Sequence, residues 1–282
     1  TDSGPAEVPA GDYTGEVRGD TDSNDGDVVA DFDVSLEGGD VYTGFAAGYL
    51  SPDDDPADTP FDLLFTQDGV VSETVDTANV RVSHMSPDAP NVDVYVDGSA
   101  VLEDVAFGTT SSYLEVSAGD HDVEITAAGD ADTVVFDDTI TVAADTDYTV
   151  AAAGEISEGA DEAFAPLILE DDNSDPGSDT ARLRLVHASP DAPAVDVTAA
   201  STGDVLFDGV GYTESGSVEV PAGDYTVEVR GDTDSNDGSV VADFDVSLNG
   251  GTVYTAFAAG YLSPDDDPAD TPFDLFVAQD SN

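Results

Sequence analysis

The stretch Val240-Val-Ala-Asp-Phe-Asp-Val-Ser-Leu248 decides the fold class of this chain. Apolar residues stand at every second position, and mostly polar residues fill the positions between them. Successive side chains of a β-strand point to opposite faces of a sheet, so a period of two is typical of a half-buried strand. Val123 and Ile125 repeat the pattern in the middle of the chain. We therefore expect an all-β protein.

Turn-forming residues separate the expected strands at intervals of about eight to twelve residues. The turns are Ala-Gly-Asp, Asn-Asp-Gly, Asn-Gly-Gly and Ser-Pro-Asp, which combine residues that tolerate positive φ with proline, which fixes φ. No helical stripe competes with this pattern. About seven or eight short strands in roughly 100 residues indicate a β-sandwich of the immunoglobulin-like kind.

The chain contains a long internal duplication. Residues 1–68 repeat residues 213–280, and 57 of the 68 paired positions are identical. Duplication this close is typical of tandem-repeat proteins. We expect a partial β-sandwich over residues 1–69 and complete β-sandwiches over residues 78–171 and 180–282, joined by polar linkers.

The first unit lacks a counterpart of residues 180–212, which would supply two or three opening strands. A sandwich without these strands exposes an apolar inner face and an unpaired sheet edge. We expect the missing strands to lie upstream or to come from another chain, since strand addition between chains is a known mode of assembly. The expected partner is the protein itself, as a homopolymer, or another surface protein that supplies the strands.

Charge dominates the composition. The 63 acidic residues outweigh five basic ones, all of them arginines, and the formal net charge is -58. Such a charge makes the folded state repel itself and excludes nucleic acid or an anionic membrane as an electrostatic partner. In about 1 M salt the Debye length falls to ~3 Å, which screens neighbouring carboxylates. The composition therefore indicates a protein of a halophile. No stretch approaches the ~20 apolar residues of a membrane span.

Two related segments resemble the signature of a known family. They are His84-Met-Ser-Pro-Asp-Ala-Pro-Asn-Val-Asp-Val94 and His187-Ala-Ser-Pro-Asp-Ala-Pro-Ala-Val-Asp-Val197. Both are similar to the signature of the domain of unknown function family 4397, here of a haloarchaeal type. This family occurs on secreted and surface proteins of bacteria and archaea, commonly in tandem, and has no established activity. The resemblance therefore implies an extracellular or cell-surface location and carries over no functional residues.

Elementary chemistry favours a structural role for this signature. Pro87 and Pro90 hold the loop extended, and the Asp88 carboxylate can cap a turn. His84 and His187 stand at strand ends, where an imidazole can bond the loop backbone instead of a ligand. His121 aligns with tyrosine in the other two units, which indicates a tolerant packing position.

The sequence lacks the residues of common enzymatic sites. Without cysteine or lysine there is no thiolate nucleophile, Schiff base or P-loop lysine, and neither Gly-x-Ser-x-Gly nor His-Glu-x-x-His occurs. Pairs of carboxylates identify nothing in so acidic a chain. We expect a protein that is not an enzyme.

One acidic loop resembles a calcium-binding loop. Its oxygen ligands would be Asp20, Asp22 and Asn24, and in the second copy Asp232, Asp234 and Asn236. Hard cations such as Ca²⁺ or Mg²⁺ prefer six to eight oxygens on a flexible turn. However, glycine falls at position seven instead of six, and the acid at position twelve is aspartate. The alternative is a hairpin tip built on Asn-Asp-Gly.

These observations lead to one main hypothesis. We expect an exported structural protein of a halophilic archaeon, a subunit of a surface filament or layer that assembles through β-strand or end-to-end domain contacts, with cations bridging acidic loops. The alternative is a surface adhesin or polysaccharide-binding module. Its contacts would be Tyr49, Tyr261 and the acidic loops at 51–58 and 263–270.

Overall fold

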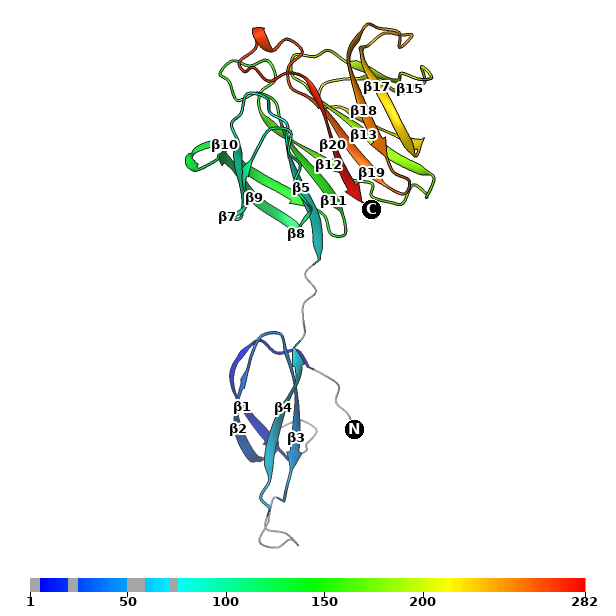
Figure 1. Ribbon diagram of the computed structural model, residues 1–282. Helices are drawn as coiled ribbons and strands as arrows, with labels where there is room; N and C mark the ends of the chain where they lie inside the picture. Colours follow the sequence, from blue (N-terminus) through cyan, green and yellow to red (C-terminus); the bar gives the residue numbers. More distant parts are fainter. Residues whose placement is uncertain (1–5, 20–24, 50–58, 71–75, 282) are drawn as a thin grey trace. The chain divides into compact units, whose positions relative to one another are not determined.

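The computed structural model describes residues 6–19, 25–49, 59–70 and 76–281. These residues form twenty strands and one short 3-10 helix, η2 (Pro264–Asp266), so the predicted all-β fold class is confirmed. The chain divides into two compact units, Thr1–Thr74 and Val75–Asn282 (Figure 1). Among the described residues, no helix is long and apolar enough to cross a membrane.

The first unit consists of two antiparallel hairpins. One pairs β1 (Gly11–Arg18) with β2 (Val28–Leu36), and the other pairs β3 (Asp40–Ala47) with β4 (Asp62–Val70). Phe32 of one hairpin packs against Phe61 beside the other, with ring centroids 6.3 Å apart. By the duplication, these strands correspond to the last four strands of the chain. The described part of the unit thus holds the second half of a sandwich.

The second unit begins with a complete β-sandwich, which we call the middle sandwich. Its strands are β5 (Thr77–His84), β6 (Val92–Val96), β7 (Ser99–Val105), β8 (Leu114–Ser117), β9 (Gly119–Ala127), β10 (Asp130–Val142), β11 (Asp147–Ala153) and β12 (Ala165–Glu170). They form two four-stranded sheets, in the orders β12-β11-β5-β8 and β10-β9-β6-β7. The pairing of β5 with β11 is parallel, and the others are antiparallel.

The last sandwich repeats this topology. Its strands are β13 (Thr180–Ala188), β14 (Val195–Ala199), β15 (Val205–Val210), β16 (Ser215–Pro221), β17 (Gly223–Gly231), β18 (Val240–Leu248), β19 (Val253–Ala259) and β20 (Asp274–Ser281). The sheet orders are β16-β13-β19-β20 and β15-β14-β17-β18, and β13 pairs with β19 in parallel. The expected tandem sandwiches are therefore present, and β18 is the strand from which the all-β fold was predicted.

The two sandwiches pack against each other through the outer faces of the sheets that contain β11 and β19. An apolar cluster joins them, with Met85, Ala151 and Ala153 from the middle sandwich and Val186 and Phe257 from the last among its members. Every residue of β19 is buried, since one of its faces lines the core of its own sandwich and the other meets the neighbour. The contact between the two sandwiches also brings charged side chains of β5 and β13 together.

Candidate functional site

The histidine-containing signature builds the corner at which each sandwich begins. His84 is fully buried, and its Nε2 lies 2.9 Å from the Pro90 carbonyl oxygen. His187 repeats this bond with the Pro193 carbonyl at 3.0 Å. Burial lowers the pKa of both imidazoles below their ordinary value. The predicted structural role of the two histidines is confirmed.

The serine and aspartates of the signature also bind backbone. The Ser86 hydroxyl donates to the Gly154 carbonyl at 2.5 Å, and the Asp88 carboxylate accepts two backbone N–H groups, from Ile156 and Ser157, at 2.9 Å each. Asp93 accepts two more, and these bonds lower its pKa. His84, Ser86, Asp88 and Asp93 thus hold the surrounding loops through bonds to the backbone.

His121 is more specific than a tolerant packing position. Its Nε2 lies 2.7 Å from the carbonyl oxygen of Ser117, four residues earlier, and its Nδ1 lies 2.7 Å from Asp97. The hydroxyls of Tyr13 and Tyr225 make the same bond to a carbonyl four residues earlier, at 2.6 Å. The position therefore needs a polar tip on a flat ring.

The most unusual site in the described structure is a buried ionic network between the sandwiches. Arg81 of β5 is 1 % exposed. Its guanidinium donates to Thr149 in its own sandwich at 2.8 Å, and across the contact to Thr255 at 3.3 Å and Asp280 at 2.6 Å. The Thr255 hydroxyl donates to the same Asp280 at 2.7 Å. One sandwich thus supplies the cation for the aspartate of the other.

Arg184 of β13 makes the equivalent bonds in the opposite direction across the contact. It donates to its own Thr255 at 2.9 and 3.1 Å and, across the contact, to Asp171 at 2.5 Å. The Thr149 hydroxyl donates to Asp171 at 2.7 Å, as Thr255 does to Asp280. The two halves are related residue by residue, because β5 and β13 occupy equivalent places in the two sandwiches. Two arginines and two aspartates make a network with no net charge.

Burial makes this network costly to disturb. The exposed fractions of the Arg81, Asp171 and Asp280 side chains are 2, 0 and 2 %, and that of Arg184 is 10 %. A buried ion pair contributes little net stability, but removal of one partner leaves an uncompensated charge. Tyr113 lies with its ring 4.9 Å from the Arg81 guanidinium carbon, and burial raises its pKa. The network therefore specifies which surfaces fit together.

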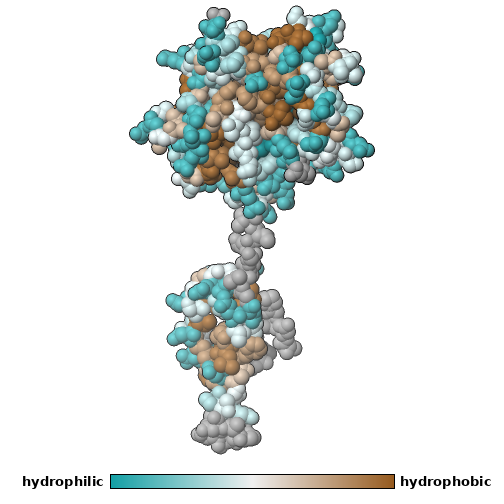
Figure 2. Space-filling model, in the orientation of Figure 1, coloured by the Kyte–Doolittle hydropathy of each residue, from teal (hydrophilic) through white to brown (hydrophobic). Residues whose placement is uncertain are grey.

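The first unit carries the acidic half of this network. Thr43 of β3 and Asp68 of β4 are the copies of Thr255 and Asp280, and the Thr43 hydroxyl donates to the Asp68 carboxylate in the same way. Phe45, the copy of the buried Phe257, is 53 % exposed. The described residues of this unit place no arginine beside Asp68. Figure 2 shows apolar surface on this unit.

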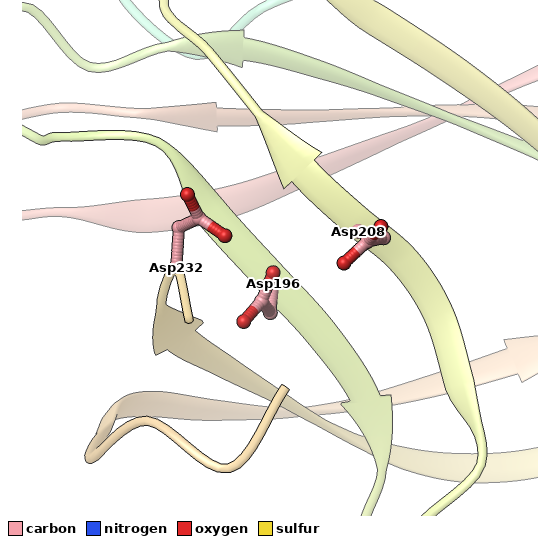
Figure 3. Close-up of side chains that lie close together, drawn as sticks. All are labelled: Asp196, Asp208 and Asp232. Carbon is pink, nitrogen blue, oxygen red and sulfur yellow. The ribbon is translucent and has the colours of Figure 1, made fainter. Parts of the chain in front are cut away.

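A second group of charged residues lies in the last sandwich. Asp196 of β14, Asp208 of β15 and Asp232, which follows β17, place carboxylate oxygens within 4.8 Å of one another (Figure 3). Asp196 is buried and accepts backbone N–H groups from Gly209 and Thr233, at 2.9 and 3.0 Å. Burial and the neighbouring Asp196 and Asp208 raise the pKa of Asp232. Three carboxylates of this kind suit a hard cation such as Ca²⁺.

This acidic group overlaps the predicted calcium loop at Asp232. Among the described acidic residues of the predicted loop, Asp234 is not a member of the group. Asn236 adopts a positive φ of 54°, and its N–H donates to the Thr233 carbonyl, as in a tight loop tip. The first-copy residues Asp20, Asp22 and Asn24 lie outside the described residues. The metal assignment stays a prediction.

The tyrosines expected at a carbohydrate site differ in exposure. Tyr49 is 39 % exposed, whereas Tyr261 is 1 % exposed and donates its hydroxyl to Glu155 of the middle sandwich at 2.8 Å. Tyr261 is therefore part of the contact between the sandwiches and not free for a ligand.

One feature of the sequence indicates the ionic network: in a chain with five arginines, Arg81 and Arg184 each precede the signature histidine by three residues.

Fold and site together define a tandem β-sandwich protein in which the middle and last sandwiches are joined through a buried ionic contact. Residues 78–198 match the family model described as "Domain of unknown function (DUF4397)", which supports the assignment of this segment to that family. The match covers the middle sandwich and the opening strands of the last. No curated protein matches the chain.

Two solved structures illustrate the more distant similarity. The Bacillus anthracis TIE protein is 9 % identical, with a TM-score of 0.21, over 89 % of this chain and 42 % of its own. The chain thus spans about two fifths of that protein. The fimbrial anchor protein Mfa2 from Porphyromonas gingivalis is 12 % identical, with a TM-score of 0.18, over 72 % of this chain and 99 % of its own. Similarity this low does not bear on the function of this chain.

Proposed function

We propose that this protein is a non-enzymatic structural protein of the cell surface of a halophilic archaeon, a subunit of an extracellular filament or layer. The observation that carries the proposal is the outer face of β3 and β4. This face copies the face of β19 and β20 that is buried against the middle sandwich. A surface that is buried in one copy and exposed in the other is a candidate assembly contact.

The outer face of β3 and β4 requires a partner that supplies a positive charge. Asp68 accepts a bond from Thr43, and in the second copy the same pair also receives a guanidinium from the neighbour. Two first units could not pack face to face, because two Asp68 carboxylates would meet without a cation. The proposed partner is a related sandwich that presents an arginine as Arg81 does, on another surface protein or on another copy of this chain in which the contact between the sandwiches has opened.

Composition supports the proposed cell-surface location and the proposed origin in a halophile. A net charge of -58 suits concentrated salt, in which carboxylates are screened from one another. The signature of His84 and His187 resembles a family found on secreted and surface proteins, and the absence of cysteine and lysine agrees with a role without catalysis. The match of residues 78–198 to the same family adds to this support.

Electron microscopy and sedimentation velocity of the full chain in molar salt test the proposal. We expect regular assemblies whose abundance rises with protein concentration. Phe45→Ser and Asp68→Asn should reduce assembly, because they change the outer face of β3 and β4. Asp33→Asn on β2 is the matched control and should assemble like the wild type. Dispersed monomers at every concentration, or equal assembly of all variants, would contradict the proposal.

A further inference from the structure

The cores of the two complete sandwiches are organised differently. In the last sandwich the buried apolar residues form one continuous cluster. In the middle sandwich they form two, one around Ile140 and Val150 and the other around Val94 and Ile125. Val123 and Phe136 are partly buried and touch both clusters. The middle sandwich therefore has a divided core although its topology is the same.

Strand register gives the reason for the division. In the last sandwich, Phe244 faces Val227 across the β17–β18 pair, and its ring packs on Phe273 with centroids 6.1 Å apart. The position equivalent to Val227 is Val123, which faces Asp138. An aspartate thus stands where the last sandwich has a large ring. Phe136 faces Ile125, one pair further along the strand.

A cavity of about 290 Å³ lies between the sheets of the middle sandwich, and Val123, the partner of Asp138 in the strand pair, is one of its lining residues. Its walls come from both sheets of the middle sandwich and include Val82, Val94 and Ile140. Apart from Glu115 and His121, every lining residue is aliphatic. The smaller Val82, in place of Leu185 in the last sandwich, enlarges the space. The cavity belongs to one sandwich and is separate from the ionic contact.

An empty apolar cavity lowers the stability of a protein in proportion to its volume. Apolar cavities of roughly half this size stay dry and bind small apolar molecules. Both polar side chains of the lining argue against an anionic ligand, since Glu115 is itself acidic and His121 is already bonded to Asp97 and to the Ser117 carbonyl. No described lining residue is a lysine or arginine. Aliphatic walls also cannot compensate the desolvation of a charged group of either sign, so the cavity suits an uncharged occupant.

We propose that the middle sandwich binds one uncharged hydrocarbon chain, such as an alkyl or isoprenoid chain, between its two sheets. The aliphatic walls bury the chain, and the lining has no lysine or arginine to pair with a carboxylate or phosphate head group. This binding site is independent of the proposed assembly contact, because it lies in the core of the middle sandwich.

Binding of 1-decanol to the full chain in molar salt tests this proposal. Isothermal titration calorimetry should show one saturable site per chain. Asp138→Phe, which restores a ring at the equivalent position, and Val101→Phe, which narrows the cavity from β7, should each weaken binding at least tenfold. Asp138→Asn removes the same charge without filling the space, so it should bind like the wild type. Circular dichroism checks that each variant is folded.

A measurement on the wild type gives an independent readout. The chain has four isoleucines, of which Ile125 and Ile140 line the cavity, whereas Ile156 and Ile168 are exposed elsewhere. In methyl NMR spectra, 1-decanol should shift the resonances of Ile125 and Ile140 and leave those of Ile156 and Ile168 unchanged. Absence of saturable binding, or equal shifts of all four, would overturn the proposal, as would undiminished binding by the folded phenylalanine variants.

Discussion

Two buried histidines give the folded state a predictable response to acid. Burial lowers the pKa of His84 and His187 below 6.5, so the unfolded chain takes up protons first as the pH falls. Their stabilising contribution is complete above about pH 6.5 and declines below it, by up to about 1.4 kcal/mol for each tenfold difference in proton affinity between the folded and unfolded chain. We expect the free energy of unfolding, from denaturant titrations in molar salt, to decrease from about pH 7.5 to about pH 5.5. A flat profile would contradict this.

His121 acts in the opposite direction. Its bonds to the Ser117 carbonyl and Asp97 raise its pKa, so its contribution is complete below about pH 6.5 and is lost as the pH rises through the folded-state pKa. His121→Tyr places in the middle sandwich the residue found at positions 13 and 225, which keeps a bond to the carbonyl. We expect this variant to lose stability more steeply on acidification than the wild type, in the same titrations. An unchanged slope would show that His121 does not titrate as argued.

The ionic network predicts strong coupling between its members. Arg81→Met should cost about 3–5 kcal/mol, because it leaves the buried Asp280 without its cation. The double variant with Asp280→Asn should cost less than the sum of the single variants, with a coupling energy of about 1–3 kcal/mol in a double-mutant cycle.

Arg182→Met provides the matched control for this prediction. Arg182 pairs with Asp172 at 3.0 Å and with Glu219 at 2.9 Å, and these acid side chains are 68 and 52 % exposed, so loss of the two ion pairs should cost about 1 kcal/mol or less each. If the two arginines cost the same, the buried network does not carry the contact.

At the scale of elements, one glycine allows the two sandwiches to approach closely. Gly108 has a φ of 77°, and a Cβ there would lie 2.3 Å from the ring of Phe276 in the other sandwich. That ring packs edge-on against Phe107, with centroids 5.2 Å apart, so a displaced ring would lose this contact. Gly108→Ala should therefore displace the contact as well as strain the backbone. Thermal unfolding should show a loss clearly larger than the roughly 1 kcal/mol of a positive-φ glycine alone.

Gly98 supplies the comparison for this variant. Its φ is 74°, nearly the same, but a Cβ there would meet no atom within 4 Å. Gly98→Ala should show the backbone cost alone. Equal losses in the two variants would mean that the Phe276 ring yields without cost.

Strand content could be predicted from the sequence because alternation and turn residues are local signals. Burial could not, as β3 and β19 demonstrate. Their sequences, Val-Tyr-Thr-Gly-Phe-Ala-Ala after Asp40 and Val-Tyr-Thr-Ala-Phe-Ala-Ala, differ at one position, yet β19 is wholly buried and most of β3 is exposed. The difference comes from a neighbouring sheet, which no local pattern encodes. A strand that is covered on both faces, as β19 is, has a nearly continuous run of apolar residues instead of an alternating pattern.

The candidate sites were harder to predict for the same reason. Asp196 lies in the Val-Asp-Val end of the signature, and Asp208 lies on the next strand, far in sequence from the acidic loop that resembles a calcium site. Sheet pairing brings them to Asp232. The ionic network likewise joins residues about 200 positions apart, such as Arg81 and Asp280. The separation of two residues along the chain does not predict that they lie close together in space.

At the scale of the whole molecule, charge sets the conditions for folding. With a net charge of -58, self-repulsion should loosen or unfold the domains below roughly 0.2 M monovalent salt, where the Debye length approaches the spacing of surface carboxylates. Circular dichroism after dialysis into dilute buffer should show loss of the β-sheet signal, and return to molar salt should restore it. An unchanged spectrum would contradict the proposed halophilic origin.

The arginines and aspartates that form the ionic contact, or that copy its residues, are present in unequal numbers. Arg81 and Arg184 are two donors, whereas Asp68, Asp171 and Asp280 are three acceptors on equivalent strands. Within the described residues, Asp68 is the acceptor that no arginine reaches, so the outer face of β3 and β4 can receive an arginine-bearing sandwich without displacing an existing ion pair.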